Sequence, residues 1–283
     1  MPMICDVDLE LWKFKDIYFD EGPHVYTDSL GTKFTSVTRF VHECSEELEW
    51  ERYTQTYAER NNLPVEEVRN KFADDKFKFC DDEKWCVIAQ NYADKHGRTY
   101  EDVKAEWDAN KEVAASMGTQ VHAYMENLWK RKHYQPDTPV GDYEQVRKNG
   151  LDAYTYLQRR FVPIRNEFIV YKPEWALCGT IDFLCWDRAN DCIAILDWKT
   201  NKEIKKDNPY GGRLIGPLNG LPDCNYIHYS AQLSTYKLLV ERMTDLRIGE
   251  LALVHLKRDG WEYIQCRDFS VEIGAYLGNL KRG

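Results

Sequence analysis

Two apolar segments that each carry an aspartate constrain this 283-residue chain more than any other feature. The segments GTIDFL and ILDWKT contain Asp182 and Asp197, and turn-forming residues 188–190 lie between them. Their composition predicts two antiparallel strands joined by a short turn, which would bring the two carboxylates side by side. Lys199 follows Asp197 by two residues, so the alternation of a strand should point both side chains to one face.

Carboxylates of like charge in apolar strands indicate a bound cation. Burying them is costly unless a cation neutralises them, and hard oxygen ligands suit Mg²⁺ or Mn²⁺. We therefore expect one or two such ions at Asp182 and Asp197, with the main-chain carbonyl of Trp198 as a further ligand. A metal of this kind polarises a phosphoryl oxygen and activates a water molecule, and Lys199 would orient that water or stabilise developing charge. The predicted chemistry is phosphodiester hydrolysis.

Two acids and a histidine outside this hairpin are further candidates for the site. The amphipathic stretch at residues 119–132 follows Gly118 and places His122 and Glu126 four residues apart, on a common helix face. We expect His122 to bind metal. Glu126 could bind metal or could be an ordinary acid on the helix surface. Glu167 is a candidate catalytic acid, and the alternative is an exposed acid of the strand NEFIVYK.

The segment IHYSAQLSTYKLLVERM has helical periodicity and carries candidates for DNA contact. Gln232 and Tyr236 are one helical turn apart, and Tyr229 could join the same face. The alternative is a simple hydrogen bond along the helix. Lys202, Lys205 and Lys206 are candidates for phosphate contacts, although each could be ordinary solvated charge. These residues follow the predicted catalytic strand directly or line the next helix.

The rest of the chain predicts a mixed α/β protein. Its expected elements are a hairpin over residues 24–41 turning at 28–31, helices within 46–115 with breaks at 61–64 and 96–99, helices at 119–132 and 143–160, strands at 166–172, 177–187 and 191–200, a long loop at 207–225, a helix at 227–243, strands at 250–257 and 261–266, and a final helix at 271–280. We expect two domains, an N-terminal hairpin and helical module at 1–117 and a catalytic core at 118–283.

Charge is distributed unevenly between these two parts. Residues 1–117 contain 15 basic and 26 acidic residues, whereas residues 118–283 contain 23 and 21, within a net charge of −9. The first part is therefore an acidic module, and one hypothesis is that it docks a replication or recombination protein or forms a lid that limits access of DNA. The second part could present local basic surface to DNA.

Cysteine usage and the N-terminus bear on the compartment. The nine cysteines include no CxxC pair, and reduced thiols are expected. The acidic N-terminus and the lack of a long apolar run favour a cytoplasmic protein without a membrane anchor, in the host cytoplasm if it is phage-encoded.

Taken in order, the motifs across residues 118–236 resemble the RecB-like branch of the PD-(D/E)XK nucleases. The elements are GTQVH, Glu167, GTID, DWK and QLSTY. The resemblance implies a restriction-endonuclease-like core, with a mixed central β-sheet flanked by helices. It assigns catalysis and metal binding to His122, Asp182, Asp197 and Lys199, with Glu167 and Gln232 as further catalytic residues. It also implies that the helix bearing Gln232 and Tyr236 contacts DNA.

The opening HVYTDSLGTKFTSVT is similar to that of phage-encoded and mitochondrial genome maintenance exonucleases. The resemblance implies a Mg²⁺- or Mn²⁺-dependent DNA exonuclease acting at DNA ends or on single strands in replication, recombination or repair. Two alternatives stay open: a structure-specific endonuclease on the same core, and a catalytically silent DNA-binding recombination partner. Relatives with an iron–sulfur cluster carry three late cysteines. Only Cys224 and Cys266 follow the catalytic strand here, so no cluster is expected.

Overall fold

The computed structural model describes residues 4–20, 25–45, 55, 58–59, 62–72, 83–208 and 211–280. Contacts divide the chain into two compact units, Met1–Glu46 with Ser116–Gly283 and, separately, Glu47–Ala115. This division differs from the predicted boundary after residue 117. The first 46 residues group with the core because one of their strands pairs into its sheet. The predicted boundary also falls inside one continuous helix, α7 (Tyr100–Trp129).

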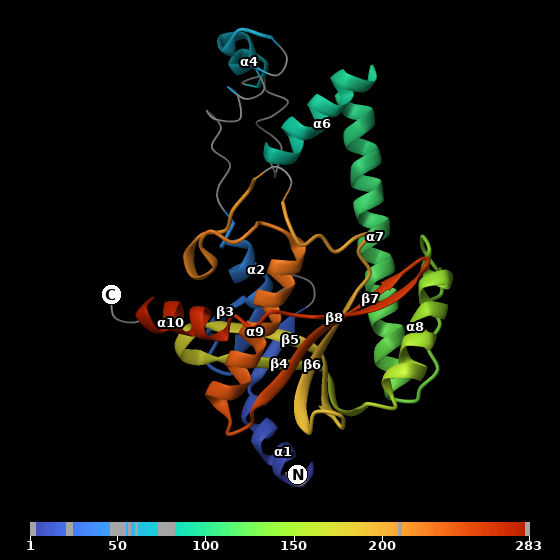
Figure 1. The fold of residues 1–283 in the computed structure, drawn as a ribbon, viewed down its shortest axis with the longest axis vertical. Helices are drawn as coiled ribbons and strands as arrows, with labels where there is room; N and C mark the ends of the chain where they lie inside the picture. Colours follow the sequence, from blue (N-terminus) through green and yellow to red (C-terminus); the bar gives the residue numbers. More distant parts are fainter. Residues whose placement is uncertain are drawn as a thin grey trace. The chain divides into compact units, whose positions relative to one another are not determined.

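The larger unit is built on a mixed sheet (Figure 1). Its described strands are β1 (Ile17–Asp20), β2 (Val25–Asp28), β3 (Lys33–Ser36), β4 (Phe161–Lys172), β5 (Leu177–Asp187), β6 (Cys192–Lys199), β7 (Ile248–Lys257) and β8 (Gly260–Gln265). Their order is β1-β2-β3-β5-β6-β7-β8, and β4 pairs with β5. The β3–β5 and β6–β7 pairs are parallel and the others antiparallel. The predicted meander of three strands is confirmed as β4-β5-β6.

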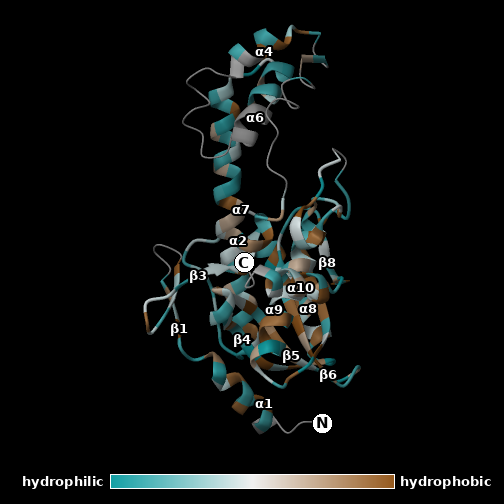
Figure 2. Ribbon diagram, turned by 90° about the vertical axis from the view of Figure 1, so that its left-hand side faces the viewer, coloured by the Kyte–Doolittle hydropathy of each residue, from teal (hydrophilic) through white to brown (hydrophobic). Residues whose placement is uncertain are grey.

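Helices cover both faces of this sheet. They are α1 (Ile4–Leu11), α2 (Val37–His42), α8 (Tyr143–Leu157), α9 (Asn225–Met243), α10 (Ser270–Leu280) and the C-terminal part of α7, with short 3₁₀ turns η1 (Trp12–Phe14), η2 (Pro173–Trp175) and η3 (Gly216–Leu218). Figure 2 shows much of the strongly hydrophobic ribbon in the sheet and in the helices packed on it. The predicted α/β fold, a restriction-endonuclease-like core with flanking helices, is confirmed.

Strand alternation explains these layers. In β6, Ile193 and Ile195 join the hydrophobic cluster that includes α9 and α10, whereas Leu196 and Trp198 join the cluster that includes α7 and α8. Successive side chains of a strand point to opposite faces, so an almost continuously apolar strand needs a helical layer on each side. Asp197, on the face of Ile193 and Ile195, is therefore directed toward the α9 layer.

One edge of β5 is paired by two different strands, which leave a gap between them. Strand β4 pairs along β5 from Leu177 to Asp187 on one edge. On the other edge, β3 pairs only with Leu177 and Cys178, and β6 pairs only with residues 183–187. Among the described residues, no strand pairs with 179–182 on this second edge. The backbone between β3 and β6 is thus left open at the position of Asp182.

Several local predictions are confirmed by specific contacts. Asp28 Oδ1 accepts hydrogen bonds from the Leu30 and Thr32 amides at 2.9 and 2.8 Å, which fixes the predicted hairpin turn. Helix α6 (Glu83–His96) ends at the predicted break, and Thr99 caps α7 by accepting from the Asp102 amide at 3.2 Å. The predicted helices at 46–54 and 73–82 lie outside the described residues.

Two predicted boundaries are wrong. Gly118 does not separate two helices, since α7 continues through it; a glycine inside a helix costs only about 1 kcal/mol, which the surrounding helix can absorb. Strand β4 begins at Phe161 and not at the predicted residue 166, so that it includes Pro163. Proline lacks an amide donor but is tolerated on an edge strand at a bulge, and the β4–β5 register shifts between Pro163 and Arg165.

The smaller unit has its own modest core. It contains α4 (Val65–Phe72), α6 and the N-terminal part of α7. Buried Ala89, Ala93 and Val103 pack with Tyr100 and Trp107. Within the described residues of the whole chain, no helix is long and apolar enough to cross a bilayer.

Candidate active site and metal centre

The β5–β6 hairpin brings together the two aspartates of the sequence motif. The main-chain amide of Trp198 donates a hydrogen bond to Asp182 Oδ2 at 3.0 Å, which ties the Asp182 side chain to β6. Lys199 Nζ lies 2.6 Å from Asp197 Oδ2, so these two side chains share a face, as strand alternation predicts. Both are largely buried, with side-chain exposures of 15% for Lys199 and 3% for Asp197.

Helix α7 and strand β4 complete a group of side chains that could hold a metal ion. His122 Nδ1 lies 3.3 Å from Asp182 Oδ2. The ligand atoms of His122, Glu167 and Asp182 all lie within 4.8 Å of one another. Two side chains far apart in the sequence therefore converge on the aspartate at the open edge of β5.

Glu167 occupies a strained position in the middle of β4. Its φ is +47°, a left-handed conformation that is uncommon outside glycine. Its neighbours Asn166 and Phe168 pair with Phe183 and Ile181, which places Glu167 across from Asp182. Strain of this kind persists only where the surrounding structure enforces it, and it is frequent at functional sites. Glu167 lies within β4, in the part of the strand that the sequence predicted at residues 166–172.

The carboxylates of the site repel one another. Glu167 retains exposed surface, yet burial among protein atoms, followed by the charges of Asp182, Glu126 and Asp197, raises its pKa to about 8. Burial and the charge of Asp182 raise the pKa of Asp197 to about 6, although Lys199 opposes the shift. Burial lowers the pKa of Lys199, but the Asp197 and Asp182 carboxylates outweigh it and the net pKa is raised. One ammonium thus faces several acids.

A cluster with this excess of negative charge favours the binding of a cation. His122, Glu167 and Asp182 supply one imidazole nitrogen and carboxylate oxygens, a donor set that suits a divalent ion such as Mg²⁺ or Mn²⁺. Burial and then repulsion from neighbouring carboxylates raise the pKa of Glu167, and a bound cation would oppose both by favouring the charged form. Asp197 is closest to Lys199 and lies outside this three-residue group, so its predicted role as a ligand stays a prediction.

The two other predicted ligands are placed as follows. Glu126 lies one turn after His122 on α7, and its carboxylate forms an ion pair with Lys130. Trp198 pairs with Val254 of β7, and its indole is fully buried, 5.6 Å from the Phe183 ring. The Trp198 side chain is therefore part of the core and does not stack on a base. Metal binding by its carbonyl and by Glu126 stays a prediction.

Helix α9 presents its predicted residues toward this site. Gln232 Nε2 donates to the Tyr236 hydroxyl at 2.9 Å, the hydrogen bond that the sequence allowed as an alternative to DNA contact. Tyr236 is only 3% exposed, and its ring packs so closely on Gly179 that a Cβ there would lie 2.6 Å from a ring carbon. Tyr229 faces Lys199, with 4.6 Å between Lys199 Nζ and the ring centroid.

Two residues that sequence reasoning missed stabilise this arrangement. The Tyr229 hydroxyl donates to Asn201 Oδ1 at 2.8 Å, and the Asn201 carbonyl lies 2.6 Å from His255 Nε2. His255 pairs with Lys199 in the β6–β7 register and is 2% exposed. Its only sequence signal is a histidine inside the apolar strand ELALVHLK. Together these contacts fix the chain that leaves β6 just after Lys199.

The predicted basic run lies on this same segment. The Lys205 amide donates to Asn225 Oδ1 at 2.7 Å, and Lys206 Nζ lies 5.5 Å from the Tyr226 ring centroid. Lys202 is exposed. The run therefore borders the start of α9, and its contact with phosphate stays a prediction.

The mixed sheet carries a His–Glu–Asp group beside an Asp–Lys pair, the kind of centre expected of a metal-dependent nuclease. Residues 95–268, more than half of the chain, match the family model of the PD-(D/E)XK nuclease superfamily. The chain belongs to this superfamily, whose members use divalent metals. No curated protein matches the sequence.

Proposed function

We propose that this protein is a Mg²⁺- or Mn²⁺-dependent DNA exonuclease that acts at DNA ends or on single strands in replication, recombination or repair. The observation that carries the proposal is the convergence of His122, Glu167 and Asp182 within 4.8 Å, next to the Lys199–Asp197 pair. A nuclease needs a cation site and a fixed positive group where phosphate charge develops. The site supplies both.

Each residue has a chemical role in this proposal. His122, Glu167 and Asp182 would hold the divalent ion, which lowers the pKa of water and stabilises phosphate charge when it is bound. Lys199 donates hydrogen bonds to the attacking water or to an oxygen that gains charge. Asp197 and Tyr229 hold the Lys199 ammonium from two sides, at 2.6 Å from the carboxylate and 4.6 Å from the ring.

The reaction consumes one water molecule for each bond broken. The water oxygen attacks phosphorus, the bond from phosphorus to the sugar oxygen breaks, and that oxygen receives a proton. The products are a phosphate monoester and a free hydroxyl. A preference for DNA ends is inferred from the similarity of the opening sequence to phage-encoded and mitochondrial exonucleases. The same centre would also serve a structure-specific endonuclease.

Digestion of matched DNA substrates tests the proposal. End-labelled linear single-stranded and double-stranded DNA would be incubated beside closed circular DNA, with Mg²⁺, Mn²⁺ or EDTA. We expect loss of linear DNA only, abolished by EDTA and by Lys199→Ala. Lys148→Ala, which removes an exposed lysine from α8, is the matched control and should digest DNA like wild type.

The other outcomes assign the remaining functions. Cleavage of closed circles would replace the exonuclease by an endonuclease. A folded wild-type protein that binds DNA but cleaves none of these substrates with either metal would instead be a catalytically silent DNA-binding protein. Circular dichroism of each variant would establish that it is folded.

A further inference from the structure

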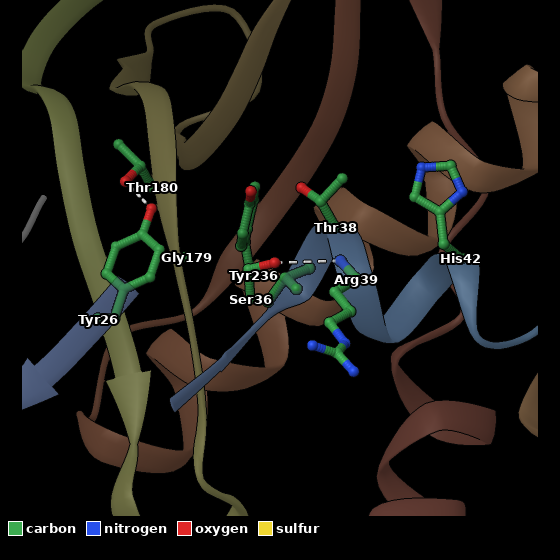
Figure 3. Close-up of a pocket in the computed structure, with 9 residues that line it drawn as sticks. Tyr26, Ser36, Thr38, Arg39, His42, Gly179, Thr180 and Tyr236 are labelled. Carbon is green, nitrogen blue, oxygen red and sulfur yellow. Dashed lines mark hydrogen bonds between the residues drawn. The ribbon is translucent and has the colours of Figure 1, made fainter. Parts of the chain in front are cut away.

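A recess of about 490 Å³ adjoins the metal centre (Figure 3). Its buried floor contains Tyr26, Val37, Gly179 and Tyr236. Its more exposed lining consists of Ser36, Thr38, Arg39, His42 and Thr180. In Figure 3, Tyr26 and Thr180 lie on one side, the α2 residues lie on the other, and Tyr236 lies between them. The volume is within the range of pockets that hold small ligands.

The position of the recess follows from the division of the sheet. Gly179 and Thr180 belong to the segment of β5 that is left between β3 and β6. Thr180 precedes Asp182 by two residues, a distance of about 7 Å along a strand. One lining residue of the recess therefore lies about 7 Å along β5 from the aspartate of the candidate metal site.

The lining of the recess differs in charge from the candidate metal centre. None of its nine described lining residues is acidic, and Arg39 supplies a guanidinium. Three hydroxyls line the recess as well, on Ser36, Thr38 and Thr180. Ser36 Oγ accepts from the Arg39 amide at 3.1 Å and keeps its own proton to donate, whereas Thr180 Oγ1 shares a hydrogen bond with the Tyr26 hydroxyl at 3.1 Å. An anion-accepting recess thus adjoins a cation-accepting cluster in a chain of net charge −9. A polyanionic strand crossing this edge would meet both.

We propose that this recess binds the DNA phosphate next to the one that is cut, through Arg39 and the hydroxyls beside it. The proposal rests on the proposed function and assigns the site a second phosphate position. The ligand chemistry is a phosphate group on a nucleotide, supplied either by an internal phosphodiester or by a terminal phosphate monoester. Tyr26 and Tyr236 form the wall behind it and are too buried to act as stacking platforms.

Arg39 is able to serve this role because its present partner is weak. Its Nε lies 2.9 Å from Glu43 Oε1, and the two side chains are 76% and 57% exposed. Exposed ion pairs of this kind contribute little and exchange readily with other anions. A phosphate can therefore compete with Glu43, and the two residues should affect binding in opposite directions.

Binding of fluorescent single-stranded oligonucleotides tests the proposal separately from cleavage. Dissociation constants would be measured by anisotropy in Ca²⁺ over a range of salt concentrations. The strands would carry a 5′ phosphate, a 3′ phosphate or no terminal phosphate. Arg39→Ala should weaken binding on the order of tenfold and reduce the salt slope by about 0.7. Arg39→Lys should weaken binding less than Arg39→Ala does.

Glu43→Gln should strengthen binding roughly twofold to threefold, because it frees Arg39. Arg188→Ala and Asp191→Asn make the same charge changes at the exposed β5–β6 turn, at the opposite end of the hairpin. Both should bind like wild type. This pair of controls separates a contact in the recess from a general effect of net charge.

The three oligonucleotides distinguish a terminal phosphate from an internal one as the ligand of the recess. An Arg39→Ala effect confined to one phosphorylated end assigns the recess to a terminal phosphate, and an effect on all three strands assigns it to an internal one. Equal binding by Arg39→Ala and Arg188→Ala would overturn the proposal even if the enzyme cleaves DNA. If wild type cleaves nothing but binding still depends on Arg39, the exonuclease assignment fails and the recess stands.

Discussion

The aspartates at the two ends of the β5–β6 hairpin lie in opposite electrostatic surroundings. At the turn, Asp187 is fully buried and Arg160 donates to it from Nε and Nη2 at 2.9 and 2.6 Å. The Ala189 amide and Asn190 Nδ2 donate as well, at 2.9 and 2.8 Å. At the open end, Asp182 and Asp197 lie among further acids. The carboxylate that is compensated within the chain therefore has a structural role, whereas the uncompensated acids fit the proposed cation site.

Ionisation follows the same contrast. Burial alone would raise the pKa of Asp187, but the hydrogen bonds from Arg160 and the turn outweigh it, and the net pKa is lowered. At the other end, burial and neighbouring carboxylates raise the pKa of Asp197 to about 6 and that of Glu167 to about 8. The charged form of Asp187 is therefore favoured at the turn, whereas the charged forms of Asp197 and Glu167 are disfavoured at the open end.

The largest expected effect is on catalysis at the open end. Asp182→Asn removes a metal-binding charge and should lower DNA cleavage by at least about a hundredfold. The initial rate of digestion per folded molecule measures it. Asp187→Asn is the matched change at the other end of the same strand and should retain that rate. Equal losses of digestion rate in the two variants would contradict the assigned difference between the two ends of the hairpin.

Next in size is the cost of breaking the turn network. Asp187→Ala leaves the Arg160 guanidinium partly buried without its main partner and should lower the free energy of unfolding by about 3 kcal/mol. Urea denaturation at pH 7 without metal measures this change. Glu167→Gln, which removes a repelled charge, should unfold at the same or a higher urea concentration. A strongly destabilised Glu167→Gln would refute the assigned repulsion.

Divalent metal should stabilise the folded protein by a similar amount. At a free metal concentration of 100 times the dissociation constant, linkage gives about 2.7 kcal/mol. Thermal unfolding with Mn²⁺ or EDTA tests this, since a metal that binds only the folded state raises the melting temperature. The increase should disappear in Asp182→Asn and persist in Asp187→Ala. An increase that survives in Asp182→Asn would move the metal site elsewhere.

The smallest expected effect is a difference in pH dependence without metal. Because its folded pKa is lowered, Asp187 stabilises the protein above the ordinary aspartate pKa of about 3.9 and loses this contribution as pH falls through the folded pKa. Glu167 has a raised folded pKa, so its contribution is greatest below the ordinary value near 4.5 and is lost as pH rises toward about 8.

Urea midpoints at pH 3, 6 and 8.5 in EDTA separate these contributions. The decline from pH 6 to 8.5 should be smaller in Glu167→Gln, and the decline from pH 6 to 3 should be smaller in Asp187→Asn. If the urea midpoint changes with pH in both variants as it does in wild type, other groups dominate the pH dependence of stability.

Local chemistry made much of the fold predictable. Strand alternation placed Asp197 and Lys199 on one face, and the observed 2.6 Å contact agrees. The hairpin turn was also readable from the sequence, because it depends on residues only two to four positions apart. Residue order alone could not show that Gly118 lies within a helix or that β4 begins before Pro163, because neighbouring elements and edge position decide both.

The sequence by itself determined the residue types of the centre, the strand periodicity that pairs Asp197 with Lys199, and the apolar runs that require a layer on each face of the sheet. Only the tertiary structure decided that β3 and β6 meet the same edge of β5 and leave Asp182 open between them. It also decided that Glu167 is held at positive φ opposite this aspartate and that Arg39 lines a recess beside it. These are contacts between distant segments, whose pairing is set by packing across the whole sheet and is not encoded in any local pattern.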